Sequence, residues 1–272
     1  MRFSQVDVFS SEPLLGNPVA VVHDAAEVTD AQMAAFARWT NLSETTFLLP
    51  PTDPAADYRL RIWTPGGELP FAGHPTLGSA HAWLEAGGVP RGADVVQECG
   101  AGLVRIRRTG RLAFAAPPLV RSGEVSDADL ARICRALRMP VGAVVESQWI
   151  DNGPGWVGVL LEDARSVLAL EPDWAAFDGL DVGVVGAYAD GPAACEVRAF
   201  CPGYGITEDP VTGSLNAGIG QWLGGRHLPA SYVAAQGTAL GRAGRVHVET
   251  AEDGTVWVGG DTTTTITGSA SF

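Results

Sequence analysis

The sequence has little basic charge, and this shortage excludes two classes of partner. Its 18 Lys and Arg residues face 31 Asp and Glu residues, which gives a formal net charge of −13 at pH 7. An acidic chain without a basic cluster is repelled by phosphate backbones and by anionic lipid. Nucleic acids and membrane surfaces are therefore not expected as partners.

The sequence also lacks a long hydrophobic run. No stretch of 18 or more consecutive apolar residues is present, so no transmembrane helix is expected. The first residues, MRFSQVDVFSSEP, alternate polar and apolar side chains and do not show the charged and apolar regions of a secretory signal peptide. We therefore expect a soluble, cytoplasmic protein.

Cysteine and histidine are too sparse to suggest a disulfide framework or a metal centre. The four cysteines are scattered, and no two of them form a C-x-x-C pair. Each is expected to be a small buried side chain; they are Cys99, Cys134, Cys195 and Cys201. No two of the five histidines have the H-x-x-x-H spacing of a helical metal pair. The sequence predicts neither a metal nor a cofactor.

Apolar and turn-forming residues, by contrast, are plentiful. Hydrophobic residues make up 46% of the chain, which also contains 34 Gly and 18 Pro. Such a chain can bury a core and must turn often between short elements. Its 272 residues suit two domains of roughly 100–150 residues each. Helical and alternating patterns interleave in both halves, which predicts an α/β (α+β) protein with antiparallel or mixed sheets.

Local patterns place the individual elements. Alternating or apolar strand-like segments predict strands at 2–9, 17–22, 45–49, 58–63, 94–98, 103–107, 111–115, 144–150, 156–161, 180–188 and 195–200. Thr29 and Gln32 have the spacing of a capping box, which begins a helix over 30–39. A second helix is expected after Gly-His-Pro at 73–75, with Pro75 at its first position and Gly87-Gly88 at its end. Ser126 precedes a third helix, which ends before Pro140.

Two prolines suggest how the chain divides. Pro117-Pro118 favours an extended connector, so we expect an N-terminal lobe at 1–117 and a C-terminal lobe at 118–260. The segment 261–272 contains a Thr-rich run, and we expect it to return to the first lobe as an edge strand.

The two halves contain a short internal echo. The segments His74-Pro75-Thr76-Leu77-Gly78-Ser79 and Asp209-Pro210-Val211-Thr212-Gly213-Ser214 both read x-P-x-x-G-S, and each opens an apolar helix. This predicts two similar halves whose helix N-termini face each other across a cleft. Unpaired N–H groups at two such ends would together hold a carboxylate. In the alternative interpretation the prolines only start helices, and Asp209 only caps one.

A lone carboxylate, Glu44, lies between a helix end and a strand in the segment Asn41-Leu42-Ser43-Glu44-Thr45-Thr46-Phe47. One interpretation is a surface glutamate. If apolar walls enclose the side chain instead, loss of solvation raises its pKa towards the range of a general base near neutral pH. The periodicity of the sequence does not decide between the two.

Four segments in one order carry a family resemblance. They are Gly16-Asn17-Pro18-Val19-Ala20-Val21-Val22, the segment 41–47, Phe71-Ala72-Gly73-His74-Pro75-Thr76 and Glu208-Asp209-Pro210-Val211-Thr212-Gly213-Ser214. Together they span nearly the whole chain and closely resemble the PhzF family of isomerases. The resemblance implies a diaminopimelate-epimerase-like fold, in which two pseudo-symmetric lobes each wrap a curved sheet around a central helix. It also implies a homodimer, which we expect to use the apolar strand 156–161 of the second lobe.

The chemistry that this resemblance implies is a cofactor-independent isomerisation. PhzF moves a proton along the ring of trans-2,3-dihydro-3-hydroxyanthranilate during phenazine biosynthesis, and Glu44 matches its acid/base. His74 and Asp209 match further catalytic positions. Substrate-binding positions are then expected at Ser43, Gly73, Thr76, Thr212, Gly213, Ser214 and Asn216, and the amides near the two glycines would hold the substrate carboxylate. Asn216 departs from the family pattern, and it either contacts substrate or hydrogen-bonds within its helix.

Two other functions stay open at this point. Epimerases of the same fold use two cysteine thiols at the helix starts, whereas neither glycine-rich segment here contains Cys. A one-base mechanism with Glu44 is therefore favoured over an amino-acid epimerase or racemase. A non-catalytic carboxylate-binding protein is the third possibility, although such a protein has no need of a proton-transfer residue.

Overall fold

A computed structural model describes residues 1–204 and 207–272 of the chain. The helices are α1 (Asp30–Thr40), α2 (Gly73–Glu85), α3 (Asp127–Ala136), α4 (Ala164–Leu168) and α5 (Gly213–Leu223). The first strands are β1 (Arg2–Val8), β2 (Asn17–Val22), β3 (Glu44–Leu49), β4 (Tyr58–Thr64), β5 (Gly67–Leu69), β6 (Val95–Cys99), β7 (Gly102–Arg107) and β8 (Leu112–Ala115). The others are β9 (Arg121–Glu124), β10 (Val144–Asp151), β11 (Trp156–Leu161), β12 (Asp181–Ala187), β13 (Cys195–Phe200), β14 (Glu208–Asp209), β15 (Ser231–Gln236), β16 (Gly244–Thr250), β17 (Val256–Gly260) and β18 (Thr262–Ser269).

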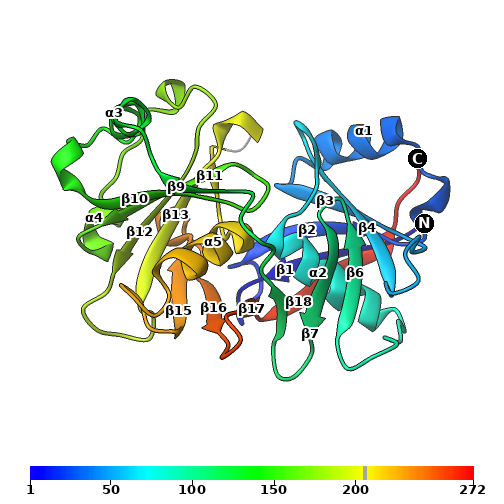
Figure 1. The fold of residues 1–272 in the computed structure, drawn as a ribbon. Coiled ribbons are helices and arrows are strands. Elements are labelled where there is room, and N and C mark those ends of the chain that lie inside the picture. The colour runs from blue at the N-terminus through cyan, green and yellow to red at the C-terminus, as the bar shows by residue number, and fades with distance from the viewer. Residues whose placement is uncertain (205–206) are drawn as a thin grey trace.

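The strands form two repeats with the same order, which lie side by side in Figure 1. The first repeat pairs β18–β1–β2–β3–β4–β6–β7–β8. The second pairs β9–β10–β11–β12–β13–β15–β16–β17. In each repeat the third and fifth of these seven pairings are parallel and the others are antiparallel. The predicted mixed α/β fold of diaminopimelate-epimerase type is confirmed.

The two repeats are joined into one sheet, because β8 pairs with β17. The short strands β5 and β14 extend β4 and β13 in the same way, each directly before a central helix. The late strand β18 pairs with β1 over 262–269, so the first repeat is assembled from both ends of the described chain. The predicted division of the chain near residue 117 stays a prediction.

Each repeat wraps its strands around one central helix, α2 in the first and α5 in the second (Figure 1). Both helices are apolar around most of their circumference, which is typical of a buried helix. Small residues let the strands approach: a Cβ on Gly78 would lie 2.4 Å from the Val19 side chain, and one on Gly218 would lie 2.6 Å from the Ile150 carbonyl oxygen. The main core cluster runs through both repeats without a break.

Local capping signals act as predicted. The Thr29 hydroxyl and the Gln32 side chain form a complete capping box at the start of α1. Ser126 caps α3 by accepting a hydrogen bond from the Asp129 N–H. These helix starts were predictable because a cap depends on residues only three positions apart.

The register of the internal echo was wrong. In the structure α2 begins at Gly73 and α5 at Gly213, so these two glycines correspond, whereas the sequence match pairs Gly213 with Gly78. Asp209 accordingly lies in β14 rather than at a helix cap, and Pro75 is the third residue of its helix. The physical reason is tertiary: the two glycines are equivalent because their backbones meet, which a short sequence match does not record.

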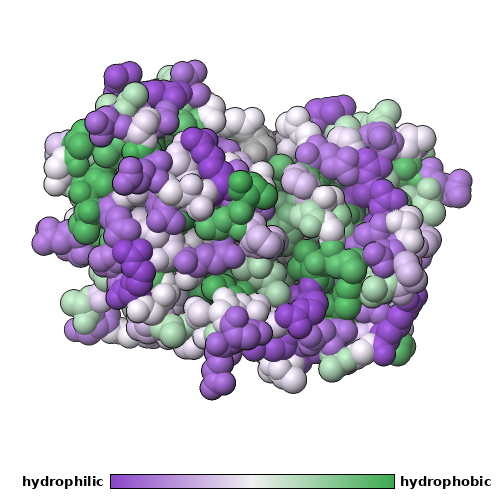
Figure 2. Space-filling model, viewed as in Figure 1, coloured by the Kyte–Doolittle hydropathy of each residue, from purple (hydrophilic) through white to green (hydrophobic). Residues whose placement is uncertain are grey.

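The expected dimer surface also needs correction. All six residues of β11 are buried inside the chain, against α5 on one face and α3 on the other, so their apolar side chains are not available to a second copy. A homodimer stays a prediction without an assigned surface. Figure 2 shows a face on which hydrophilic residues and hydrophobic patches are interspersed. Among the residues that the structure describes, no helix is long and apolar enough to cross a membrane.

Candidate active site

The N-termini of α2 and α5 meet at the junction of the two repeats, as the echo predicted. A Cβ on Gly73 would lie 2.6 Å from the Cα of Gly213, and a Cβ on Gly213 would lie 2.8 Å from the Cα of Gly73. Neither helix has a side-chain cap in the described part of the chain. Their first N–H groups therefore have no partner within the helix, and both positive helix ends converge on one point.

A small cavity of about 30 Å³ lies at this point. Both repeats line it, through Glu44, Leu69, Ala72, Gly73, His74, Pro154, Trp156, Cys201, Asp209, Thr212, Gly213 and Ser214. A cavity of this size holds only a few waters, so a ring-sized ligand enters only when the walls move apart. Surface hollows of about 450–500 Å³ exist elsewhere, but none of those includes Glu44 or a helix start.

Glu44 is a buried carboxyl and not a surface residue, since only 9% of it is exposed. It is the first residue of β3, three positions after Asn41, which caps the end of α1 in the left-handed conformation (φ 54°) that asparagine tolerates. Burial raises the pKa of the Glu44 carboxyl well above its usual range, and the negative charge of Asp209 adds to this rise. The chain thus places a carboxyl of high proton affinity in the cavity wall.

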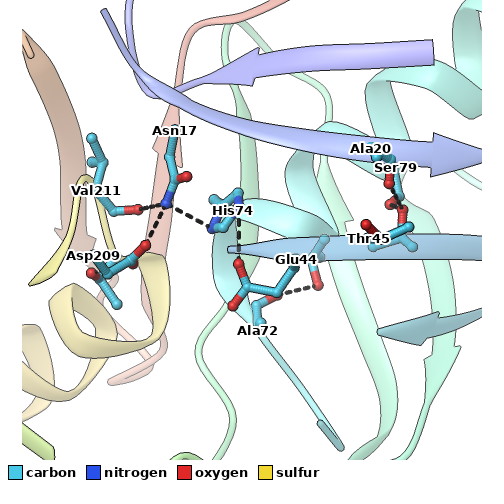
Figure 3. A network of polar contacts seen from close by, with 12 residues as sticks. Asn17, Ala20, Glu44, Thr45, Ala72, His74, Ser79, Asp209 and Val211 are labelled. Atoms are coloured by element: carbon cyan, nitrogen blue, oxygen red, sulfur yellow. Dashed lines mark hydrogen bonds and ion pairs between the residues drawn. The ribbon is translucent and has the colours of Figure 1, made fainter. Parts of the chain in front are cut away.

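His74 also lines the cavity, and its imidazole faces the Glu44 carboxyl (Figure 3). Its Nε2 lies 3.3 Å from Glu44 Oε2, and neither of these two buried atoms has a hydrogen-bond partner among the described residues. Burial lowers the pKa of His74 to about 3, and a hydrogen bond with the backbone of Pro18 opposes this shift. Proline has no N–H, so the imidazole donates and the Pro18 carbonyl accepts. At neutral pH the imidazole is uncharged.

Asp209 is held by the first repeat through Asn17 (Figure 3). Asn17 Nδ2 donates to Asp209 Oδ1 at 2.8 Å and to the Val211 carbonyl at 2.9 Å, and it lies 3.2 Å from His74 Nδ1. Thr212 Oγ1 donates to the other carboxylate oxygen at 2.6 Å.

Burial raises the pKa of the Asp209 carboxyl to about 6, while hydrogen bonds from Thr212, Asn17 and Ser43 oppose the rise. Ser43 does not line the cavity, and it is connected to the site through its hydrogen bond to Asp209.

Neither Thr76 nor Asn216 lines the cavity, so the substrate contacts predicted for them stay predictions. Thr76 Oγ1 donates to a backbone carbonyl one turn back and accepts a bond from Gln97 Nε2 at 3.0 Å. Asn216 Nδ2 likewise donates to a carbonyl one turn back and to Gln236 Oε1, both at 2.9 Å. Each residue lies three positions into its helix and faces a strand, so these bonds tie the helix starts to β6 and β15.

The residues of this site that sequence reasoning missed include Asn17, Trp156 and Cys201. Asn17 lies within the Gly-Asn-Pro segment, which was a usable signal, although no role was predicted for it. Trp156, whose Nε1 donates to Ser214 Oγ at 3.0 Å, and Cys201 line the cavity only because distant strands pair. Burial raises the pKa of the Cys201 thiol well above its usual range, and nearby carboxylates, Asp209 first, raise it further. The described residues contain no group of three or more His, Cys, Asp and Glu side chains arranged to hold a metal ion.

Comparisons with known proteins agree with this geometry. A family model described as "Phenazine biosynthesis-like protein" matches residues 6–271. The chain belongs to the PhzC-PhzF family. It is 34% identical to trans-2,3-dihydro-3-hydroxyanthranilate isomerase of Pseudomonas aeruginosa, covering 90% of this chain and 89% of that protein. It is 37% identical to "Antisense-enhancing sequence 1" of Schizosaccharomyces pombe, covering 98% and 97%.

A solved structure shows the same fold. The PhzF-family protein of Enterococcus faecalis superposes with a TM-score of 0.81 at 25% identity, covering 100% of this chain and 99% of that one. Since the family is one of isomerases and the match spans nearly the whole chain, this chain is a PhzF-family isomerase.

Proposed function

We propose that the chain is a cofactor-independent isomerase that moves a proton on a small carboxylated ring bearing amino or hydroxyl groups, of the trans-2,3-dihydro-3-hydroxyanthranilate type, in secondary-metabolite biosynthesis. One observation carries the proposal. Glu44 Oε2 and His74 Nε2 are buried, 3.3 Å apart and without hydrogen bonds in the described chain, at the same cavity that receives two uncapped helix starts.

The helix starts provide the binding half of the reaction. The free N–H groups at Gly73 and Gly213 point their partial positive charge at one place, where a substrate carboxylate binds without a cationic side chain. This anchors the ring with one face towards Glu44. The small cavity then has to open before the ring enters and close around it afterwards, which removes water from the reacting atoms.

Glu44 provides the chemical half. Its carboxylate takes a proton from one ring carbon, the electron pair of that C–H bond shifts along the conjugated system, and the new Glu44 O–H returns the proton to another ring carbon. No atom is gained or lost. The raised pKa serves both steps, because the carboxylate is a stronger base than an exposed glutamate and the acid is still a competent donor near neutral pH.

His74 and Asp209 orient the substrate in this scheme. The uncharged imidazole offers its Nε2 side to the same cavity edge as Glu44, and Asp209 is fixed by Asn17 and Thr212. Loss of either side chain is expected to change KM and kcat together, because a misplaced ring loses its alignment with Glu44.

The test is turnover of trans-2,3-dihydro-3-hydroxyanthranilate by wild type and by Glu44→Gln, followed by NMR in D₂O. Glutamine keeps the size of the side chain but has no titratable proton, so kcat should fall by roughly 10²–10⁴-fold while the substrate still binds. Glu196→Gln is a matched control. Glu196 is also buried with a raised pKa, but it bonds Tyr188 and Thr238 instead of lining the cavity.

The outcomes separate the competing functions. Transfer of the proton to a different carbon supports the isomerase, whereas inversion at the same carbon with uptake of deuterium indicates an epimerase. Binding without any turnover by wild type indicates a carboxylate-binding protein. Undiminished turnover by Glu44→Gln would exclude Glu44 as the acid/base.

A further inference from the structure

The second repeat also has a carboxylate at the start of β12, the strand that corresponds to β3. Glu44 is the first residue of β3, and Asp181 is the first residue of β12. In the parallel pairing of each repeat, Glu44 lies beside Val19 of β2 and Asp181 lies beside Trp156 of β11. Continuing the β12–β13 register by one residue places Asp181 opposite Cys201. Both carboxylates therefore begin the corresponding strand of their repeat.

Their side chains point in corresponding directions, because residues two apart in a strand share a face. Gly183 lies against α5 so closely that a Cβ would come within 2.1 Å of Leu215. Asp181, two residues earlier, therefore points to the same inner face. In the first repeat Thr46, two residues after Glu44, bonds Ser79 of α2 at 2.9 Å.

Asp181 does not itself line the cavity, but it lies next to it, because both of its strand neighbours, Trp156 and Cys201, line it. It is 9% exposed, the same as Glu44. Within the described chain no N–H or O–H group donates to its carboxyl. Burial raises the pKa of Asp181 to about 7, and the negative charge of Asp151 adds to this rise. The carboxyl oxygens are not fully enclosed, so water can reach them in the free protein, and a donor on a bound ligand would replace that water.

We propose that Asp181 is a specificity-determining residue of this site, whose carboxyl accepts a hydrogen bond from an amino or hydroxyl substituent of the ring bound between the two helix starts. This role rests on the proposed function. A ring in the opened cavity lies against Trp156 and Cys201, and a donor on that edge reaches Asp181. Glu44 then acts on the ring from the first repeat while Asp181 selects it from the second.

Binding of simple aromatic acids tests this role without requiring turnover. Benzoate, anthranilate and 3-hydroxybenzoate share the carboxylate, and only the last two carry a donor, an amine and a hydroxyl respectively. Isothermal titration at pH 8, above the pKa of Asp181, compares wild type, Asp181→Leu, Asp181→Asn and the control Glu196→Gln. Leucine removes the acceptor at similar size, whereas asparagine keeps a neutral acceptor.

We expect Asp181→Leu to weaken binding of at least one donor-bearing acid about tenfold or more, which is the worth of a hydrogen bond to a charged group. Benzoate should change less than twofold, Asp181→Asn should fall in between, and Glu196→Gln should bind like wild type. The acid that responds identifies the amine or the hydroxyl as the group recognised. If the leucine variant does not fold, the asparagine variant alone carries the test.

Two results would overturn this role alone: equal weakening of benzoate, which indicates a structural effect, or unchanged binding of all three acids. Failure of all three acids to bind wild type would instead contradict the carboxylate site between the helix starts. That result overturns the proposed function and this role with it, so the two failures are distinguishable.

Discussion

Replacing Asn17 with alanine should destabilise the protein by an amount that depends on pH. The Asn17 amide donates to Asp209 Oδ1 at 2.8 Å and to the Val211 carbonyl at 2.9 Å, and the side chain is fully buried. The variant therefore loses one hydrogen bond to a neutral carbonyl and one to a titratable carboxyl. Only the second changes in strength when Asp209 ionises.

The magnitudes follow from the two kinds of bond. At pH 5 Asp209, with a pKa of about 6, is mostly protonated, and two neutral bonds contribute about 1–3 kcal/mol. At pH 8 Asp209 is ionised, and its bond is worth about 1.5–3 kcal/mol, so the total becomes about 2–4.5 kcal/mol. The free energy lost on substitution should thus be larger at pH 8 by about 1–1.5 kcal/mol.

The sign agrees with proton linkage. Because the folded-state pKa of Asp209 is raised above its unfolded value of 3.8, its contribution to stability is lost as pH rises through about 6. Removing the Asn17 bond raises that pKa further, by about one unit at 1.36 kcal/mol per unit. In Asn17→Ala the loss therefore continues to about pH 7.

Urea unfolding of wild type and variant at pH 5 and pH 8 measures this difference. Asn152→Ala is the matched control, because Asn152 is also buried and donates to the Ser214 carbonyl at 2.9 Å, where no titratable group accepts. The control should lose the same free energy at both pH values. An Asn17→Ala loss that is equal at both pH values would refute the assignment of Asp209 as an ionising partner.

Three further predictions concern the same junction and the assembly. Gly73→Ala should lower the free energy of unfolding by about 1–3 kcal/mol, because the new Cβ overpacks against Gly213, and should lower turnover about 10²-fold. Gly142→Ala is the control, because no atom lies within 4 Å of its new Cβ. Urea unfolding and kinetic assays should show no measurable change in stability or turnover for this control. The His74 imidazole should show no titration by NMR between pH 5 and 9, because its pKa lies near 3, and a midpoint near 6.5 would contradict its burial as an uncharged ring. Light scattering should give twice the 28.4 kDa of one chain if the predicted homodimer forms, and a mass of 28.4 kDa at micromolar concentration would exclude it.

Much of the fold was predictable because its signals are local. The capping box at Thr29, the apolar run over 156–161 and the glycines after α2 each depend on residues a few positions apart. The four segments that resemble PhzF also predicted that Glu44, His74 and Asp209 belong to one site. The structure brings these three side chains to one cavity.

The remaining parts of the site depend on contacts that no local pattern contains. The correct repeat register appears only where Gly73 meets Gly213, and the roles of Thr76 and Asn216 appear only once the strands that carry their glutamine partners are in place. Asp181 has no motif around it, and aligning β3 with β12 through their pairings is the signal that finds it.

The position of β18 has a consequence for how the protein is made. On the ribosome β1 emerges first, but its partner β18 follows seventeen other strands and emerges last among them. The second repeat, whose strands β9 to β17 are contiguous in sequence, is fully synthesised before the first repeat can close. Domains tend to fold as units in the order of synthesis, yet here the half that starts earliest must wait with one edge of its sheet unpaired. During that interval the free edge of β1 can pair with other nascent chains. We therefore expect chaperones to bind mainly to the first repeat while the chain is being made.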